Sequence, residues 1–151
     1  MINILLPAIG GGGNFFKDSY FPKLLTEING KTMIELVIDN YNGLAQKNYI
    51  FVFDDEECIK FHVDSSVKIL SPSSNVIRLS RQTAGALCTC LMAIDYINND
   101  TELIIANCDQ IIDVDYNEVV AYFEKIDADA GIITFPNSRK IHPRWLRKKI
   151  R

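Results

Sequence analysis

Short apolar runs rich in β-branched and aromatic residues alternate along the chain with segments whose apolar positions recur at helical spacing. The runs at 2–6, 49–53 and 102–106 are nearly continuous, as is typical of strands buried on both faces of a parallel sheet. Shorter extended segments are predicted at 67–70, 76–79 and 130–135. The alternation predicts an α/β fold in which a doubly wound, mostly parallel sheet is sandwiched by helices.

Start signals mark two of the predicted helices. Thr32 and Glu35 have the spacing of a capping box, and the apolar positions of the segment that follows are Ile34, Val37, Ile38, Tyr41 and Leu44. Asp115 and Glu118 form a variant of the same box at the start of a helix predicted at 116–125.

Two further helices are predicted from less direct signals. The four acids at 54–57 follow a strand, and we interpret them as a helix first turn rather than as metal ligands, because carboxylates there complement the helix dipole. Thr83 is the predicted cap of a later helix, whose expected buried face is Ala86, Leu87, Cys90, Leu91 and Ile94. Asn29 and Gly30 are expected in a tight turn.

The composition is that of a compact domain, since 48% of the 151 residues are hydrophobic and 10% are aromatic. No apolar run approaches the ~20 residues of a membrane span, and the amino terminus lacks the basic and apolar regions of a secretory leader. We therefore expect a cytoplasmic protein without a membrane partner. The cysteines form no C-x-x-C pair and are interpreted as reduced thiols: Cys58, Cys88, Cys90 and Cys108.

The net charge of −3 hides an uneven distribution of charge. Residues 1–138 hold 9 basic and 19 acidic side chains, a net charge of −10, whereas 139–151 hold 7 basic side chains and no acid. Basic tails can bind nucleic acid, but this one has a single aromatic residue, Trp145, and no nucleic-acid motif. We interpret it as a solvated run, and predict a domain at 1–145 followed by a basic tail at 146–151.

Four consecutive glycines, Gly10 to Gly13, follow the first predicted strand. Because glycine has no Cβ, the backbone N–H groups of such a loop can converge on a phosphate chain. A dinucleotide fingerprint fits poorly because its third glycine position holds Phe15. A P-loop ending in Gly30-Lys31-Thr32 fails because Leu25 replaces the earlier glycine. A glycine-rich loop without a ligand stays open as an alternative.

The region around these glycines resembles the amino-terminal signature of the sugar-phosphate nucleotidyltransferases. Three segments carry the resemblance: Pro7-Ala8-Ile9-Gly10-Gly11-Gly12-Gly13-Asn14-Phe15, Phe21-Pro22-Lys23-Leu24-Leu25 and Asn29-Gly30-Lys31-Thr32-Met33-Ile34-Glu35. The resemblance implies a catalytic Lys23 that neutralises phosphate charge. It also implies a nucleotide-binding role for Ala8, Gly10, Gly11, Gly12, Gly13 and Asn14. Asn14 stands where the family has an arginine, so one charge-assisted contact is lost.

Two later segments extend the resemblance. A family motif that contacts the base and ribose of the nucleotide has residues of similar type to Gln82, Thr83 and Gly85. An ordinary capped helix without a ligand is the open alternative for this segment. Asp109, after the run at 102–106, aligns with the family's metal-binding aspartate, which implies a catalytic role and Mg²⁺ as cofactor. Asp113 and Asp115 are weaker candidates for the same role.

The resemblance covers residues 2–145 and implies that a nucleotidyl group passes from a nucleoside triphosphate to a sugar-1-phosphate or similar phosphorylated metabolite, with release of pyrophosphate. The pathway implied is the synthesis of nucleotide sugars for surface polysaccharides. No nucleic-acid partner is expected, and assembly into a homo-oligomer is left open. The family's sugar-binding strands and second metal-binding aspartate have no counterpart in this sequence. A truncated, inactive nucleotide-binding or interaction fragment is therefore the second hypothesis.

Overall fold

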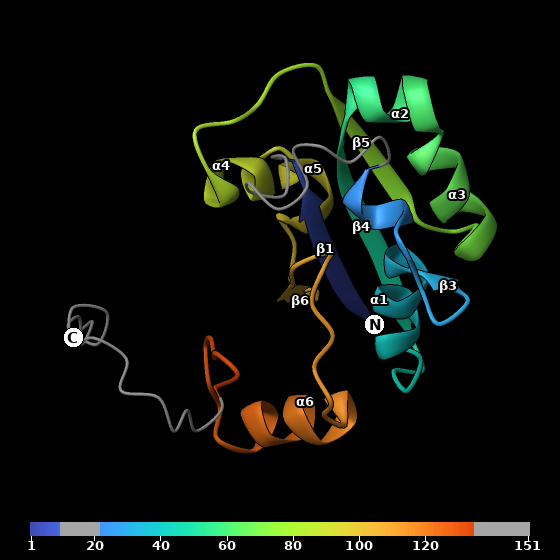
Figure 1. Ribbon diagram of the computed structural model, residues 1–151. Helices are drawn as coiled ribbons and strands as arrows, with labels where there is room; N and C mark the ends of the chain where they lie inside the picture. The colour runs from blue at the N-terminus through green and yellow to red at the C-terminus, as the bar shows by residue number, and fades with distance from the viewer. Residues whose placement is uncertain (10–21, 135–151) are drawn as a thin grey trace, which may run out of the picture. The chain divides into compact units, whose positions relative to one another are not determined.

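The computed structural model describes residues 1–9 and 22–134, and the chain divides into two compact units, Met1–Asn117 and Glu118–Arg151. The first unit contains a four-stranded parallel sheet in the order β5-β4-β1-β6 (Figure 1). The strands are β1 (Ile2–Ala8), β4 (Lys47–Asp54), β5 (Asn75–Leu79) and β6 (Glu102–Ile105). The predicted α/β fold is confirmed. The predicted domain boundary at residue 145 lies outside the described residues.

Helices cover both faces of this sheet. Figure 1 shows α4 (Ala86–Leu91) and α5 (Ile94–Ile97) on one side, with α2 (Asp55–Phe61) and α3 (Val63–Leu70) on the other. Burial from both sides explains why β1 and β4 are apolar at successive positions. The side chains that are 0% exposed in these two strands are Ile4, Leu5, Leu6, Ile50, Phe51, Val52 and Phe53.

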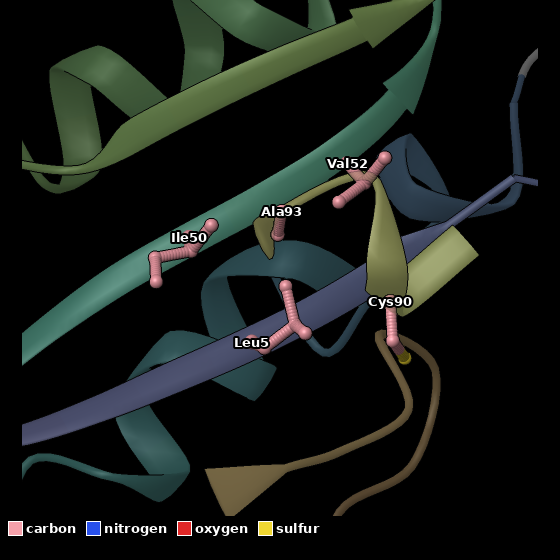
Figure 2. Packing of buried hydrophobic residues seen from close by; sticks show 5 residues of the cluster. All are labelled: Leu5, Ile50, Val52, Cys90 and Ala93. Atoms are coloured by element: carbon pink, nitrogen blue, oxygen red, sulfur yellow. The ribbon is translucent and has the colours of Figure 1, made fainter. Parts of the chain in front are cut away.

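On the first face, side chains of β1 and β4 pack beneath α4. Figure 2 shows Leu5, Ile50 and Val52 directed toward Cys90 of α4 and Ala93, which follows that helix. Partly buried apolar residues pack against this cluster: Ile9, Ile77, Leu79 and Ile97. At about 25 cal/mol per Å² of buried apolar surface, such a cluster is a main source of stability for the sheet.

The opposite face of β4 carries a column of stacked aromatic rings. The ring centroids of Tyr49 and Phe51 lie 5.9 Å apart, and those of Phe51 and Phe53 lie 5.4 Å apart. The Tyr49 hydroxyl donates to the Ile38 carbonyl oxygen of α1 (Met33–Asn40) at 2.9 Å. Because Tyr41 also packs edge-on against Tyr49, α1 belongs to this face of the sheet.

Several local predictions are confirmed. Thr32 and Glu35 form a reciprocal capping box at the start of α1. Asn29 and Gly30 have φ values of 52° and 80° in the turn that joins β2 (Glu27–Ile28) to β3 (Lys31–Thr32). Such left-handed values favour asparagine and glycine. The Asp54 carboxylate accepts from the Glu56 N–H at 2.8 Å, so the acidic segment does begin helix α2.

The prediction of a strand at 67–70 is wrong, because these residues belong to α3. Val63 and Val67 lie one helical turn apart and are both buried, so the apolar residues follow helical rather than strand spacing. The prediction that Thr83 caps the next helix is also wrong, since α4 has Gly85 at its N-cap and no side-chain capping bond.

The predicted buried face of that helix is wrong at most positions. Cys90 is 6% exposed, but Leu87 is 72%, Leu91 49% and Ile94 44% exposed. The segment is divided into α4 and α5, with Ala93 between them at φ −94°. Since the break rotates Ile94 out of the expected face, a single helical period does not describe the segment.

The sheet edge also departs from expectation. The strand predicted at 102–106 is present as β6, yet Leu103 is 37% and Ile105 54% exposed rather than buried. The prediction of a strand at 130–135 is wrong over its described part, because residues 130–134 pair with no other strand of the described chain. The predicted helix at 116–125 is confirmed as α6 (Tyr116–Lys125). No helix in the described part of the chain is long and apolar enough to cross a membrane.

Candidate functional site

The carboxyl ends of the four parallel strands lie along one edge of the sheet, which we call the carboxyl edge. Ala8 pairs with Phe53 and Asp54 pairs with Leu79, so β1, β4 and β5 end nearly level. Open α/β sheets bind ligands at this edge. Of the predicted nucleotide-binding residues, Ala8 ends β1 and is partly buried, whereas Gly10 to Asn14 lie outside the described residues.

Lys23 reaches the site from a 3-10 helix, η1 (Lys23–Leu25). Pro22 precedes it at φ −62°, and Leu24, which is 4% exposed, anchors it in the core. The Thr26 carbonyl oxygen accepts from the Met33 N–H at 2.9 Å, which ties the end of η1 to the start of α1. The backbone that presents Lys23 is therefore held by the buried Leu24 and by the bond between Thr26 and Met33.

Lys23 and Asp109, the two residues predicted to be catalytic, form an ion pair with each other. The Lys23 Nζ atom donates to Asp109 Oδ2 across 86 residues of sequence. The two side chains are 28% and 31% exposed, so the pair is partly shielded from water. The structure thus joins the basic residue of the first motif to the acidic residue of the last.

Asp109 lies in a turn just beyond β6. The Ala106 N–H donates to the Leu5 carbonyl oxygen at 3.0 Å, so pairing with β1 extends to the start of this turn. Burial, and then the charge of Asp109, raise the pKa of the Cys108 thiol to about 12. Cys108 therefore stays protonated near neutral pH and serves as a packed side chain rather than a nucleophile.

A further carboxylate, Glu57, lies in the first turn of α2, which begins at the same edge directly after β4. Burial, and then the charge of Asp54, raise its pKa above the ordinary value. The charge of Glu57 in turn contributes to the raised pKa of Cys108. The sequence predicted Glu57 in a helix first turn, which is confirmed, but not its raised pKa, because burial depends on neighbouring elements.

The segment from Gln82 to Gly85 follows β5 and is organised around one carbonyl oxygen. The Gly85 oxygen lies 3.1 Å from the Thr83 hydroxyl and accepts from the Thr89 N–H at 3.0 Å. The Thr83 and Thr89 hydroxyls lie 2.6 Å apart. Thr89 is 2% exposed and was not predicted as part of this segment. The sequence did contain a signal for it, because a polar threonine stands there among apolar positions of a helix. Gln82 is exposed.

The described residues contain no group of three or more His, Cys, Asp or Glu side chains that could hold a metal ion. Asp113 is exposed, and Asp115 Oδ1 accepts from the Asn117 N–H at 2.8 Å, as a residue at a helix start does. Asp109 already attracts a cation, the Lys23 ammonium. A single carboxylate such as that of Asp109 is compatible with Mg²⁺ binding, because this ion commonly takes one or two carboxylates together with substrate phosphates.

Several solved structures have a similar fold. UDP-glucose pyrophosphorylase from Acinetobacter baumanii is 17% identical, with a TM-score of 0.59 over 85% of this chain and 54% of that chain. HddC from Yersinia pseudotuberculosis is 21% identical, with a TM-score of 0.59 over 82% and 54%. The nucleoside-diphosphate-sugar pyrophosphorylase from Vibrio cholerae RC9 is 20% identical, with a TM-score of 0.54 over 79% and 53%.

These likenesses show that the chain shares its fold with about half of each of these structures. A family model described as nucleotidyl transferase matches residues 18–144, and the chain belongs to this family. A comparison with curated proteins gives no match. The chain spans about half the length of the solved structures that it resembles, as the 54% and 53% coverages show.

Proposed function

We propose that this chain binds a nucleoside triphosphate with Mg²⁺ at the carboxyl edge. Together with the remaining half of such a domain, it would transfer a nucleotidyl group to a sugar-1-phosphate or similar metabolite, for nucleotide-sugar and surface-polysaccharide synthesis in the cytoplasm. The Lys23–Asp109 ion pair carries the proposal. A cation suited to phosphate and a carboxylate suited to Mg²⁺ meet at the edge where such folds bind ligands. Membership of the family supports the same reaction class.

In the proposed reaction, an oxygen of the acceptor phosphate attacks the α-phosphorus of the triphosphate. The bond from that phosphorus to the bridging oxygen breaks, and its electron pair leaves with pyrophosphate. Lys23 would offset negative charge on the phosphates, and Asp109 would hold Mg²⁺, which supplies further charge neutralisation when bound. The glycines Gly10 to Gly13 would cradle the phosphates, while Gln82, Thr83 and Gly85 would contact the base and ribose.

Calorimetric titration with ATP, CTP, GTP, UTP and dTTP in Mg²⁺ tests the binding step. We expect heat from at least one triphosphate, and Lys23→Ala should weaken its binding about tenfold, since a charge-assisted contact is lost. Lys31→Ala is the matched control, because Lys31 pairs with Asp39 at 2.7 Å on the exposed side of the hairpin. Absence of heat with every triphosphate, or equal losses in the two variants, would contradict the proposal.

Pyrophosphate release with a panel of sugar-1-phosphates tests the transfer step. We expect little turnover from the 151-residue chain alone and measurable turnover when it is joined to a second half from a relative. Alignment of an acceptor can contribute ~7–11 kcal/mol, and the chain spans about half of the relatives that provide it. A rate near ~10 s⁻¹ from the chain alone, an ordinary enzyme turnover, would show that the described half suffices.

The second candidate function is a nucleotide-binding or interaction fragment that performs no transfer. The exposure of Ile105 at the sheet edge favours it, because apolar residues on an edge strand suit contact with another polypeptide. Binding of a triphosphate without turnover, even after the second half is joined, would support this candidate.

A further inference from the structure

Two threonine hydroxyls meet where the segment from Gln82 to Gly85 joins α4. The hydroxyl oxygens of Thr83 and Thr89 lie 2.6 Å apart, and they lie 3.1 and 3.3 Å from the Gly85 carbonyl oxygen. We propose that Thr89 is a positioning residue, which orients the Thr83 hydroxyl to accept a hydrogen bond from an N–H or O–H group of the nucleotide base or ribose. The inference rests on the proposed function and adds a residue and a bond direction to one of its contacts.

Thr89 is a buried polar residue whose hydrogen bonds reach beyond its own helix. It is 2% exposed, and a buried hydroxyl without partners costs free energy that alanine or valine would not incur at this position. Threonines in helices commonly bond to the carbonyl oxygen four residues earlier, and the contact with Gly85 is of this kind. The shorter contact, with Thr83, lies outside the helix, so helix formation does not explain it.

The hydrogen atoms of both hydroxyls are used within this group. A carbonyl oxygen has two lone pairs, and that of Gly85 already accepts from the Thr89 N–H at 3.0 Å. It can therefore take one hydroxyl hydrogen, and the other hydrogen lies between the two threonine oxygens. If Thr89 donates to Gly85, Thr83 donates to Thr89; if Thr83 donates to Gly85, Thr89 donates to Thr83. In both arrangements the Thr83 hydroxyl keeps a lone pair, but no hydrogen, for a ligand.

The backbone of the segment does little to fix this hydroxyl. Gly85 has a φ of 157° and a ψ of 175°, and no atom lies within 4 Å of the place that a Cβ would take. Glycine is conformationally permissive, and a threonine side chain has three staggered rotamers. The bond to the buried Thr89 selects one rotamer of Thr83 before a ligand arrives. Such preorganisation lowers the entropy that binding must overcome.

The test measures calorimetric binding, in Mg²⁺, of the nucleoside triphosphate that gives the largest heat. Thr89→Val keeps the side-chain shape and leaves the Thr83 hydrogen to Gly85, so the fold should persist while Thr83 loses its orienting partner. We expect binding to weaken about threefold to tenfold, the range of one neutral hydrogen bond. Thr89→Ser keeps the hydroxyl and should bind as the unchanged chain does. Thr101→Val makes the same change in a partly buried residue before β6 and is the control.

Two further measurements separate positioning from a structural role. In the Thr83→Val background, Thr89→Val should change triphosphate binding less than about twofold, because Thr89 acts through Thr83. Thr83→Val alone should show the full loss, which guards against a folding defect in Thr89→Val. Inorganic tripolyphosphate has neither base nor ribose, so it should displace the nucleotide from each variant with the affinity that it has for the unchanged chain.

Equal losses from Thr89→Val in the two backgrounds would overturn the inference, as would a loss that Thr89→Ser does not reverse. A matching loss of tripolyphosphate affinity would overturn it too, because the hydroxyl would then act on the phosphates. Unchanged triphosphate binding in Thr89→Val would overturn the inference and leave the proposed function standing. If the unchanged chain binds no triphosphate with Mg²⁺, the proposed function and the inference fail together.

Discussion

Two neighbouring strands, β1 and β6, have similar apolar sequences and opposite surroundings. Leu5 and Ile105 are partners in the strand register, yet Leu5 is 0% and Ile105 54% exposed. β1 lies between two strands and beneath α4, whereas β6 is the outermost strand of the described sheet. The difference shows that burial is decided by what lies beside a strand and not by its own apolar pattern.

Side-chain hydrogen bonds also distinguish β6 from the other three strands of the sheet. Asn75 Nδ2 donates to Asn48 Oδ1 at 3.2 Å, and Asn48 Nδ2 donates to Asn3 Oδ1 at 3.0 Å. This amide ladder crosses β5, β4 and β1, and the register partner of Asn3 on β6 is Leu103. Three strands are therefore linked by side chains as well as backbone, and the ladder does not continue onto β6.

The largest expected effect comes from a matched pair of truncations on the two strands. Leu5→Ala should cost about 2–5 kcal/mol in the free energy of unfolding, because it opens a cavity in a closed cluster. Ile105→Ala should cost about 1 kcal/mol or less, because its side chain is already half exposed. Urea denaturation measures both values. Similar costs would mean that β6 is covered in solution.

An intermediate effect is expected from the amide ladder. Asn48→Ala leaves the buried Asn3 side chain, 4% exposed, without its amide donor and should cost about 1–3 kcal/mol. Asn99→Ala removes two hydrogen bonds of similar length at an exposed position and should cost about 0.5 kcal/mol or less. Denaturant midpoints of the two variants give the comparison, and equal shifts would show that the ladder is not shielded from water.

The smallest effect concerns Glu57, in the first turn of α2. Its folded pKa is raised from 4.5, so folding favours the protonated acid, and this contribution is lost as pH rises through the folded pKa. Glu57→Gln should therefore raise the melting temperature at pH 7 by about 1–2 °C, and the gain should vanish near about pH 4. Glu56→Gln, at an exposed neighbouring position, is the control. A gain that persists in acid would contradict the assignment.

Local signals in the sequence predicted those elements that depend on local bonds. The capping box of Thr32 and Glu35, the Asn29-Gly30 turn and the bounds of α6 all involve residues within a few positions of one another. The nearly continuous apolar runs of β1 and β4 were also sufficient to predict these two strands, because a strand buried on both faces has apolar residues at successive positions. These parts of the fold follow from the sequence alone.

The errors fall where long-range neighbours decide the structure. The strand predicted at 130–135 has the right composition, but in 130–134 no neighbouring strand pairs with it. Leu91 and Ile94 have the spacing of a buried face, yet they are 49% and 44% exposed, and a break at Ala93 separates them. In the site, both Lys23 and Asp109 were predicted, but their contact with each other requires the register of β1 and β6. Their roles toward ligands stay predictions.

The central position of β1 has a consequence for the chain as it leaves the ribosome. β1 is made before both of its strand partners, since β4 begins at Lys47 and β6 begins only at Glu102. At translation rates of about 5–20 residues per second, the interval between the end of β1 and the end of β6 is about 5–20 s. Throughout that time the apolar strand β1 has at least one unpaired side. The nascent chain is therefore the form most exposed to aggregation, and slow codons between β5 and β6 would prolong that exposure.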